Sequence, residues 1–371
     1  MLGWMYAVQL GMFVMMDQTS ARLIEWLSRK ASAQYARDIA LVMVYGSRVN
    51  GTANARSDVD CYFIPKTQRA YDFARTFIID GIGYDVFPVS WERAEGIADL
   101  QESLIPLIGD SVPIYCATRA DMERFERLRA RLKRNLCDPR AAHSAAHARL
   151  VSAGDLLYEA RGAGDESELR MIVGYAALAL ADAVALHHNT YYHFGLKRQY
   201  ADLCTMPGVP EDICAGYRDV LLARTADAAL VSCDALLNDV CAHMGEQKPV
   251  PGVNACSGAD DVSGSHAEYG ALAKLYEEIC STFNKIYVSC DSGDAMLACI
   301  SAVCLQYELD CAHAEYGAHR YGLFEAYAPD NLTAWSGAVQ AIERDFERFI
   351  TAGGGRIRQY RTFDEFASGI E

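Results

Sequence analysis

The segment spanning residues 41–64 constrains the fold of this chain more than any other part of the sequence. It begins with an apolar run that predicts a buried strand, and Gly46 and Ser47 follow as a turn of small residues. The segment ends with the run Asp-Val-Asp-Cys-Tyr-Phe-Ile, which predicts a second strand carrying two carboxylates. Because side chains alternate along a strand, we expect Asp58 and Asp60 to point to the same face.

This spacing favours metal-dependent phosphoryl chemistry. Two carboxylates on one strand face repel each other unless a cation lies between them. Mg²⁺ takes oxygen ligands and leaves coordination positions for substrate phosphates. Gly46 lets the backbone approach a ligand closely, and the N–H groups of the turn can hold phosphate oxygens together with the Ser47 hydroxyl. The sequence therefore predicts a metal on the second strand and phosphates on the turn.

A third carboxylate is expected on a neighbouring strand. Asp85 lies in the run Gly-Tyr-Asp-Val-Phe-Pro-Val, which follows the turn-forming pair Asp80-Gly81 and predicts a short strand. In a two-metal site, with ions about 4 Å apart, one ion orients the triphosphate and the other activates the attacking oxygen. We expect Asp85 to ligate the second ion and to help take the proton from the acceptor hydroxyl.

The turn allows two other interpretations. Gly-Ser and Ser-Asp-x-Asp also occur in ordinary solvated loops, although the two strands and the third carboxylate together favour a site. Gly46 and Gly51 have the glycine spacing of a P-loop, but Thr52 and Ala53 stand where that motif requires Lys and then Ser or Thr. The P-loop interpretation is therefore rejected.

The order Tyr-Gly-Ser at 45–47, ten residues, Asp58-Val-Asp60 and then Asp85 resembles the nucleotidyltransferase superfamily typified by DNA polymerase β. The resemblance covers residues 38 to 90. It implies an N-terminal domain with a small mixed β-sheet and flanking helices. The Ala- and Leu-rich runs from residue 121 onward predict an all-α C-terminal region, so we expect an α+β fold. The resemblance also implies transfer of a nucleoside monophosphate from an NTP, expected to be ATP, with two Mg²⁺ ions on Asp58, Asp60 and Asp85. Gly46 and Ser47 are then expected on the triphosphate.

Further nucleotide-binding residues are expected around this motif. Ser57 can hydrogen-bond a carboxylate, and Arg48 or Arg56 can meet a phosphate. In nucleotidyltransferases a basic residue of the helical domain often reaches the triphosphate, so the resemblance makes Lys197 a candidate. A cationic helix start is otherwise an ordinary surface feature.

The charge of the chain bears on its partners. The formal net charge is −15 over 371 residues, whereas a protein that binds nucleic acid usually presents a basic face. The acidity thus disfavours nucleic acid and favours a small or cationic acceptor. Thirteen cysteines without a Cys-x-x-Cys pair suggest buried thiols in a reducing cytoplasm. The apolar stretch 1–16 lacks a positive n-region and is too short to span a bilayer, so we expect no membrane association.

The remaining sequence predicts the domain organisation. A helix capped by Thr19 or Ser20 should pack beside the first strand, another should cover 91–108, and a strand over 112–115 should close the first domain. A basic run within 124–134 predicts a solvated helix face, and His187 and His188 are interpreted as satisfied structural histidines. The expected divisions are a nucleotidyltransferase catalytic domain at 17–118, a helical domain at 119–246, a linker at 247–266 and a second helical segment at 267–371.

Three classes of function remain open. The first is a nucleotidyltransferase that modifies a hydroxyl of a small molecule, similar in layout to the aminoglycoside nucleotidyltransferases, for which an acidic cleft suits a polycationic antibiotic. The second modifies a protein or tRNA in a toxin-antitoxin or defence setting, or makes a nucleotide signal. The third is a non-catalytic nucleotide-binding protein that kept the fold, and the presence of all three carboxylates argues against it.

Overall fold

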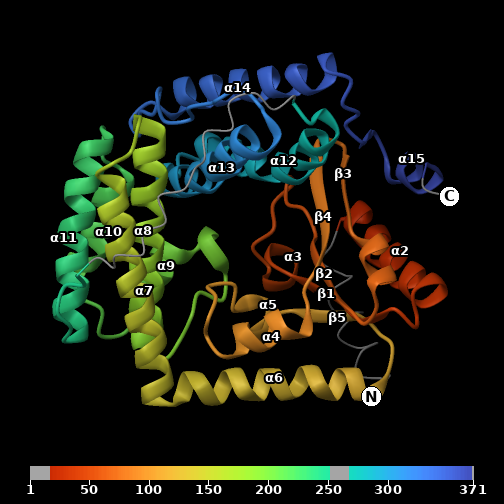
Figure 1. The fold of residues 1–371 in the computed structure, drawn as a ribbon, viewed down its shortest axis with the longest axis horizontal. Helices are drawn as coiled ribbons and strands as arrows, with labels where there is room; N and C mark the ends of the chain where they lie inside the picture. The colour runs from red at the N-terminus through yellow and green to blue at the C-terminus, as the bar shows by residue number, and fades with distance from the viewer. Residues whose placement is uncertain (1–16, 251–266, 370–371) are drawn as a thin grey trace. The chain divides into compact units, whose positions relative to one another are not determined.

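The computed structural model describes residues 17–250 and 267–369 (Figure 1). The expectations for residues 1–16 and for most of the 247–266 linker lie outside the described residues. The chain divides into two compact units, and the predicted α+β fold class is confirmed. The sheet unit comprises residues 1–138, 193–195 and 357–371, and the helical unit comprises residues 139–192 and 196–356.

The sheet unit contains a six-stranded mixed sheet with the strand order β5-β1-β2-β4-β3-β6. The pairs β2–β4 and β3–β6 are parallel and the other neighbours are antiparallel. The two predicted strands of the 41–64 segment and the strands around Asp85 and Val112 are all present. The strands are β1 Ile39–Tyr45, β2 Asp60–Pro65, β3 Arg75–Ile79, β4 Ile82–Pro88, β5 Val112–Cys116 and β6 Gln359–Tyr360.

One face of the sheet is covered by α2 (Gln18–Gln34), as expected. Leu23, Ile24 and Leu27 of α2 are buried in one core cluster with side chains of β1. The cap is Asp17 and not the predicted Thr19 or Ser20, since the Asp17 carboxylate accepts a hydrogen bond from the Ser20 N–H at 2.9 Å. A carboxylate at this position also suits the positive end of the helix dipole.

The prediction of an all-α C-terminal region needs one correction. Residues 359–360 form β6 at the edge of the sheet, and α15 (Phe363–Ser368) packs into the core beside α2 (Figure 1). The Phe366 ring stacks on Phe77 of β3 at 4.1 Å and meets Trp26 of α2 at 5.1 Å between ring centroids. Aromatic burial of this kind stabilises the segment in the sheet unit, although its neighbours in sequence are helical.

The expected helix at 91–108 is two helices, α4 (Trp91–Ala98) and α5 (Pro106–Gly109), separated at Leu100, whose φ is +64°.

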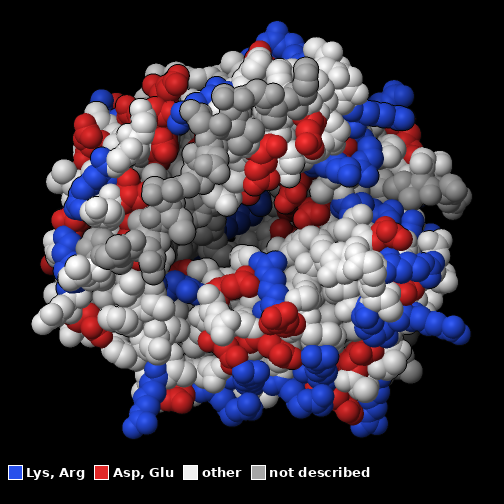
Figure 2. Space-filling model, in the orientation of Figure 1, with Lys and Arg blue, Asp and Glu red and all other residues white. Residues whose placement is uncertain are grey.

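α6 (Arg119–Cys137) belongs to the sheet unit, so the predicted boundary at 118 lies about one helix too early. α6 buries only apolar side chains. Figure 2 shows Lys and Arg alternating with Asp and Glu along it, as expected for a solvated face. The remaining short helices here are α3 (Ser47–Asn50) and η1 (Gln68–Phe73).

The helical unit is built around α8, which packs against α7, α10, α11 and α13. α8 and α13 are long and apolar enough by composition to cross a membrane, yet most of each apolar window is buried inside the protein. The helices are α7 Pro139–Ala160, α8 Glu166–His187, η2 Gly195–Lys197, α9 Gln199–Thr205, α10 Glu211–Leu221, α11 Ala226–Met244, α12 Tyr269–Ser292, α13 Ala295–Tyr316 and α14 Leu332–Ala352.

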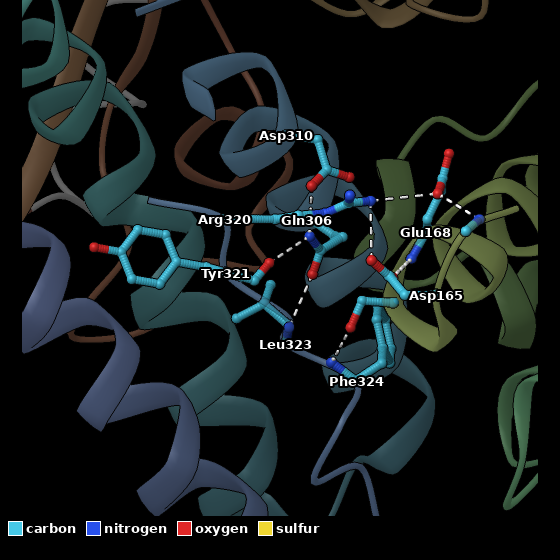
Figure 3. A network of polar contacts seen from close by, with 10 residues as sticks. Asp165, Glu168, Gln306, Asp310, Arg320, Tyr321, Leu323 and Phe324 are labelled. Atoms are coloured by element: carbon cyan, nitrogen blue, oxygen red, sulfur yellow. Dashed lines mark hydrogen bonds and ion pairs between the residues drawn. The ribbon is translucent and has the colours of Figure 1, made fainter. Parts of the chain in front are cut away.

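A polar network holds the segment after α13 in place (Figure 3). The buried Gln306 amide donates to Asp310 Oδ1 at 2.9 Å and to the Tyr321 carbonyl at 2.8 Å. The Arg320 guanidinium pairs with Asp165 at 2.9 Å and with Glu168 at 3.4 Å. Burial raises the pKa of Asp310 to about 6, so this carboxyl titrates near neutral pH.

Candidate active site

The turn after β1 brings its backbone directly against a carboxylate. Gly46 has φ 74° and ψ −155°, Ser47 begins α3, and Gly51 ends it with φ 79°. A Cβ atom built on Gly46 would lie 2.0 Å from Oδ2 of Asp60. Both the backbone conformation and this close approach require glycine. The turn and the second strand are therefore one packed unit.

The strand register places two of the predicted carboxylates side by side. In the antiparallel pair β1–β2, Tyr45 lies opposite Asp60. In the parallel pair β2–β4, Cys61 lies beside Val86, so Asp60 and Asp85 occupy the preceding adjacent positions. Both carboxylates are half-buried. A neighbouring strand thus brings Asp85 next to Asp60, the placement expected from the sequence.

Asp58 is held differently from the expectation, because β2 begins at Asp60 and Asp58 precedes the strand. The Arg48 Nε donates to the Asp58 carbonyl at 3.3 Å, and the same guanidinium donates to the Ser57 carbonyl. Arg48 also pairs with Asp17 at 2.8 Å, and its side chain is 9% exposed. The Ser57 and Asp58 carbonyls therefore accept hydrogen bonds from the Arg48 guanidinium and not from a neighbouring strand. Asp58 itself is only 8% exposed.

The loop between the turn and β2 is fixed by its own hydrogen bonds. The Thr52 N–H and hydroxyl both donate to Asn50 Oδ1, at 3.1 and 2.7 Å. The Ser57 hydroxyl accepts from the Asn54 N–H at 2.9 Å, and the Ser57 N–H donates to the Asn54 carbonyl at 3.1 Å. Ser57 thus shapes the loop that leads to the carboxylates, and its expected contact with nucleotide stays a prediction.

The charges of the three carboxylates act on the phenol of the half-buried Tyr45. Burial raises the pKa of Tyr45 well above its usual value, and the charges of Asp60, Asp58 and Asp85 raise it further, in that order. The pKa of the Cys61 thiol is raised by burial and then by Asp85 and Asp60. Negative potential is therefore concentrated where β1, β2 and β4 meet, which is an environment that stabilises bound cations.

The donor set suits the metal expected from the sequence. Carboxylate oxygens are the ligands that Mg²⁺ prefers, and Asp60 and Asp85 are adjacent in register. Within residues 17–250 and 267–369, however, no three His, Cys, Asp or Glu side chains stand together as a preformed metal site. The residues fit Mg²⁺ in chemistry and position, and binding would have to draw their carboxylates together.

Two basic residues complete the account of the site. Arg358, which directly precedes β6, donates to the Thr76 hydroxyl at 3.2 Å, and Thr76 lies opposite Asp85 in the β3–β4 register. Sequence reasoning missed Arg358 because almost the whole chain separates it from the motif. The predicted nucleotide-binding Lys197 lies in η2, and its role stays a prediction.

The comparisons with known proteins are sparse. No protein-family model matches the chain, and no curated protein matches it. Among solved structures it is similar to a nucleotidyltransferase-like protein from Exiguobacterium sibiricum, at 13% identity and a TM-score of 0.37. The match covers 60% of this chain and 77% of that one. A similarity this distant assigns no function to the chain.

Proposed function

We propose that this protein is a metal-dependent nucleotidyltransferase that moves a nucleoside monophosphate, expected from ATP, to a hydroxyl of a small molecule. One observation carries the proposal: the Gly46 turn packs on the Asp60 carboxylate, and Asp60 is adjacent to Asp85 across β2 and β4. A phosphate-binding turn and paired acidic residues are the two parts that this reaction needs.

The proposed roles follow from the placement of each group. Asp58, Asp60 and Asp85 would hold two Mg²⁺ ions, which neutralise phosphate charge when bound. The backbone of Gly46 and the Ser47 hydroxyl would bind the triphosphate. Asp85 would accept the proton of the acceptor hydroxyl as its oxygen attacks the α-phosphorus in line with the departing pyrophosphate.

The distribution of charge supports a cationic acceptor. The sheet unit has 19 Lys and Arg against 20 Asp and Glu, a net charge of −1, whereas the helical unit has 15 against 29, a net charge of −14. Almost all the acidity of the chain therefore belongs to the helical unit. Such a field attracts and orients small polycations, such as aminoglycosides, and repels nucleic acid.

The test uses purified protein with α-labelled ATP, Mg²⁺ and a panel of aminoglycosides, with Asp60→Asn as the inactive control. Release of pyrophosphate that needs both one acceptor and Asp60 would support the proposal. Label that appears on protein or tRNA would show a macromolecular acceptor instead. No use of any NTP would refute the proposal and favour a binding protein.

A further inference from the structure

Two histidines and one carboxylate of the helical unit meet beside the start of α7. His143 and His147 are four residues apart in this helix, so both rings project from the same side of it. Glu246, two residues beyond the end of α11, contacts both rings. Its Oε1 is 3.1 Å from Nε2 of His143, and its Oε2 is 3.5 Å from Nδ1 of His147. Side chains from two elements that are far apart in sequence therefore form one cluster.

The backbone on both sides of this cluster is held in place by packing. Ala142 and Ala146, which directly precede the two histidines, are buried and so set the rotation of α7. The segment that follows α11 packs against the same helix, since a Cβ built on Gly154 would lie 3.2 Å from Cβ of Pro249. Glu246 is thus held beside α7 by its own segment as well as by the two rings.

The side chains of the cluster are accessible, and the carboxylate has no stronger cation beside it. The rings of His143 and His147 are 53% and 48% exposed, and the Glu246 side chain is 21% exposed. Among the residues that the structure describes, Glu246 forms ion pairs with these two imidazoles alone. A neutral imidazole has a free nitrogen lone pair, and a carboxylate has several. The cluster therefore supplies three groups that can each bind a metal ion.

We propose that His143, His147 and Glu246 bind a divalent transition-metal ion such as Zn²⁺, which would connect α7 to the segment after α11. Two histidines at positions i and i+4 of one helix can bind the same ion. Two His and one Glu are also a set that zinc takes with water in the fourth position, whereas Mg²⁺ prefers oxygen ligands. Ligands of one tetrahedral zinc lie about 3.3–3.5 Å apart, and the two nitrogen–oxygen distances, 3.1 and 3.5 Å, are close to this spacing.

Binding requires the two rings to move toward each other. Their centroids are 6.5 Å apart, and the three groups do not converge as a preformed metal site in the described part of the chain. Two imidazoles on one tetrahedral zinc have centroids about 5 Å apart, so the rings must approach by roughly 1.5 Å. Because both rings are half-exposed, rotation about their side-chain torsions achieves this without disturbing the buried face of α7.

The test is a titration of the full-length protein with Zn²⁺, measured by calorimetry and by the melting temperature. One Zn²⁺ per chain should bind, the melting temperature should rise by a few degrees, and EDTA should reverse the rise. His143→Gln, His147→Gln and Glu246→Gln should each weaken binding at least about 10-fold and abolish the rise. His319→Gln is the matched control and should bind zinc as the wild type does. Its ring also faces a carboxylate, that of Asp345 at 3.6 Å, but it belongs to no pair of histidines four residues apart.

Three results would overturn the proposal. One is a zinc affinity of His147→Gln equal to that of the wild type, which would place the ion on other groups, such as exposed thiols. The second is a melting temperature that zinc leaves unchanged. The third is weaker zinc binding in Asp60→Asn, which would place the ion in the candidate active site. None of these measurements depends on whether the protein transfers nucleotides.

Discussion

Gly46→Ala is the sharpest perturbation of the proposed site. The native backbone at this residue, φ 74° and ψ −155°, lies in a region that is essentially confined to glycine. Holding alanine there costs on the order of 1–3 kcal/mol. The new methyl group would also stand 2.0 Å from Asp60 Oδ2, so the carboxylate must retreat by more than 1 Å to reach ordinary contact. A displacement of about 1 Å at reacting groups can lower turnover about 100-fold.

Gly51→Ala is the matched control, because Gly51 also has a positive φ, 79°, but a Cβ there meets nothing within 4 Å. It should cost about 1 kcal/mol of stability and leave turnover within a few-fold of wild type. Calorimetry should show a fall in melting temperature of about 4–8 °C for Gly46→Ala if the cost is about 2 kcal/mol. Pyrophosphate release gives the second readout. Equal losses of turnover in the two variants would refute the reasoning, since both substitutions place alanine at a positive φ but only the one at Gly46 meets Asp60.

Four further predictions follow from particular residues and their contacts. Asp60→Asn should lower pyrophosphate release at least 100-fold while the melting temperature stays within a few degrees; retained turnover contradicts the site. Arg48→Met should lower the free energy of unfolding in urea by about 2 kcal/mol, because its charged hydrogen bonds to loop carbonyls are lost; an unchanged midpoint would contradict this. The raised pKa of Asp310, about 6, means that its contribution to stability is present at low pH and lost as the pH rises through 6, so Asp310→Asn should remove that decline. The Nε2 atoms of His188 and His243 are 2.9 Å apart, and burial lowers the pKa of both rings. Their contribution to stability is therefore present above pH about 6.5 and should fall on acidification. The double variant with Gln at both positions should lose this pH dependence of the melting temperature.

The strands of the candidate site were predictable because their signals are local. The apolar run before Gly46, the Asp-x-Asp pattern and the strand around Asp85 each lie within a few residues, and the register that joins Asp60 to Asp85 follows from a simple mixed sheet. The sequence predicts Asp58 within the strand, whereas it precedes the strand and its carbonyl accepts a hydrogen bond from Arg48. The alternation of side chains along the sequence does not encode such a contact.

The parts that could not be predicted depend on residues far apart in sequence. Arg358, β6 and α15 belong to a segment that is held on the sheet by the stacking of Phe366 on Phe77. In sequence this segment has only the composition of a short capped helix, which does not indicate a partner. The break at Leu100 was missed because a positive φ at leucine is rare and has no residue signature. The roles of Lys197 and Ser57 stay predictions.

The return of residues 357–371 to the sheet unit has a consequence for how the protein is made. β6 and Phe366 complete a sheet and core whose other members lie before residue 138, so that core stays open while the whole helical unit is synthesised. At about 5–20 residues per second, a ribosome needs on the order of ten seconds or more to cover that interval. The helical unit can therefore finish folding first. Until β6 is made, the edge of β3 is unpaired and can pair with other chains, so this is the stage of synthesis at which chaperones would be needed.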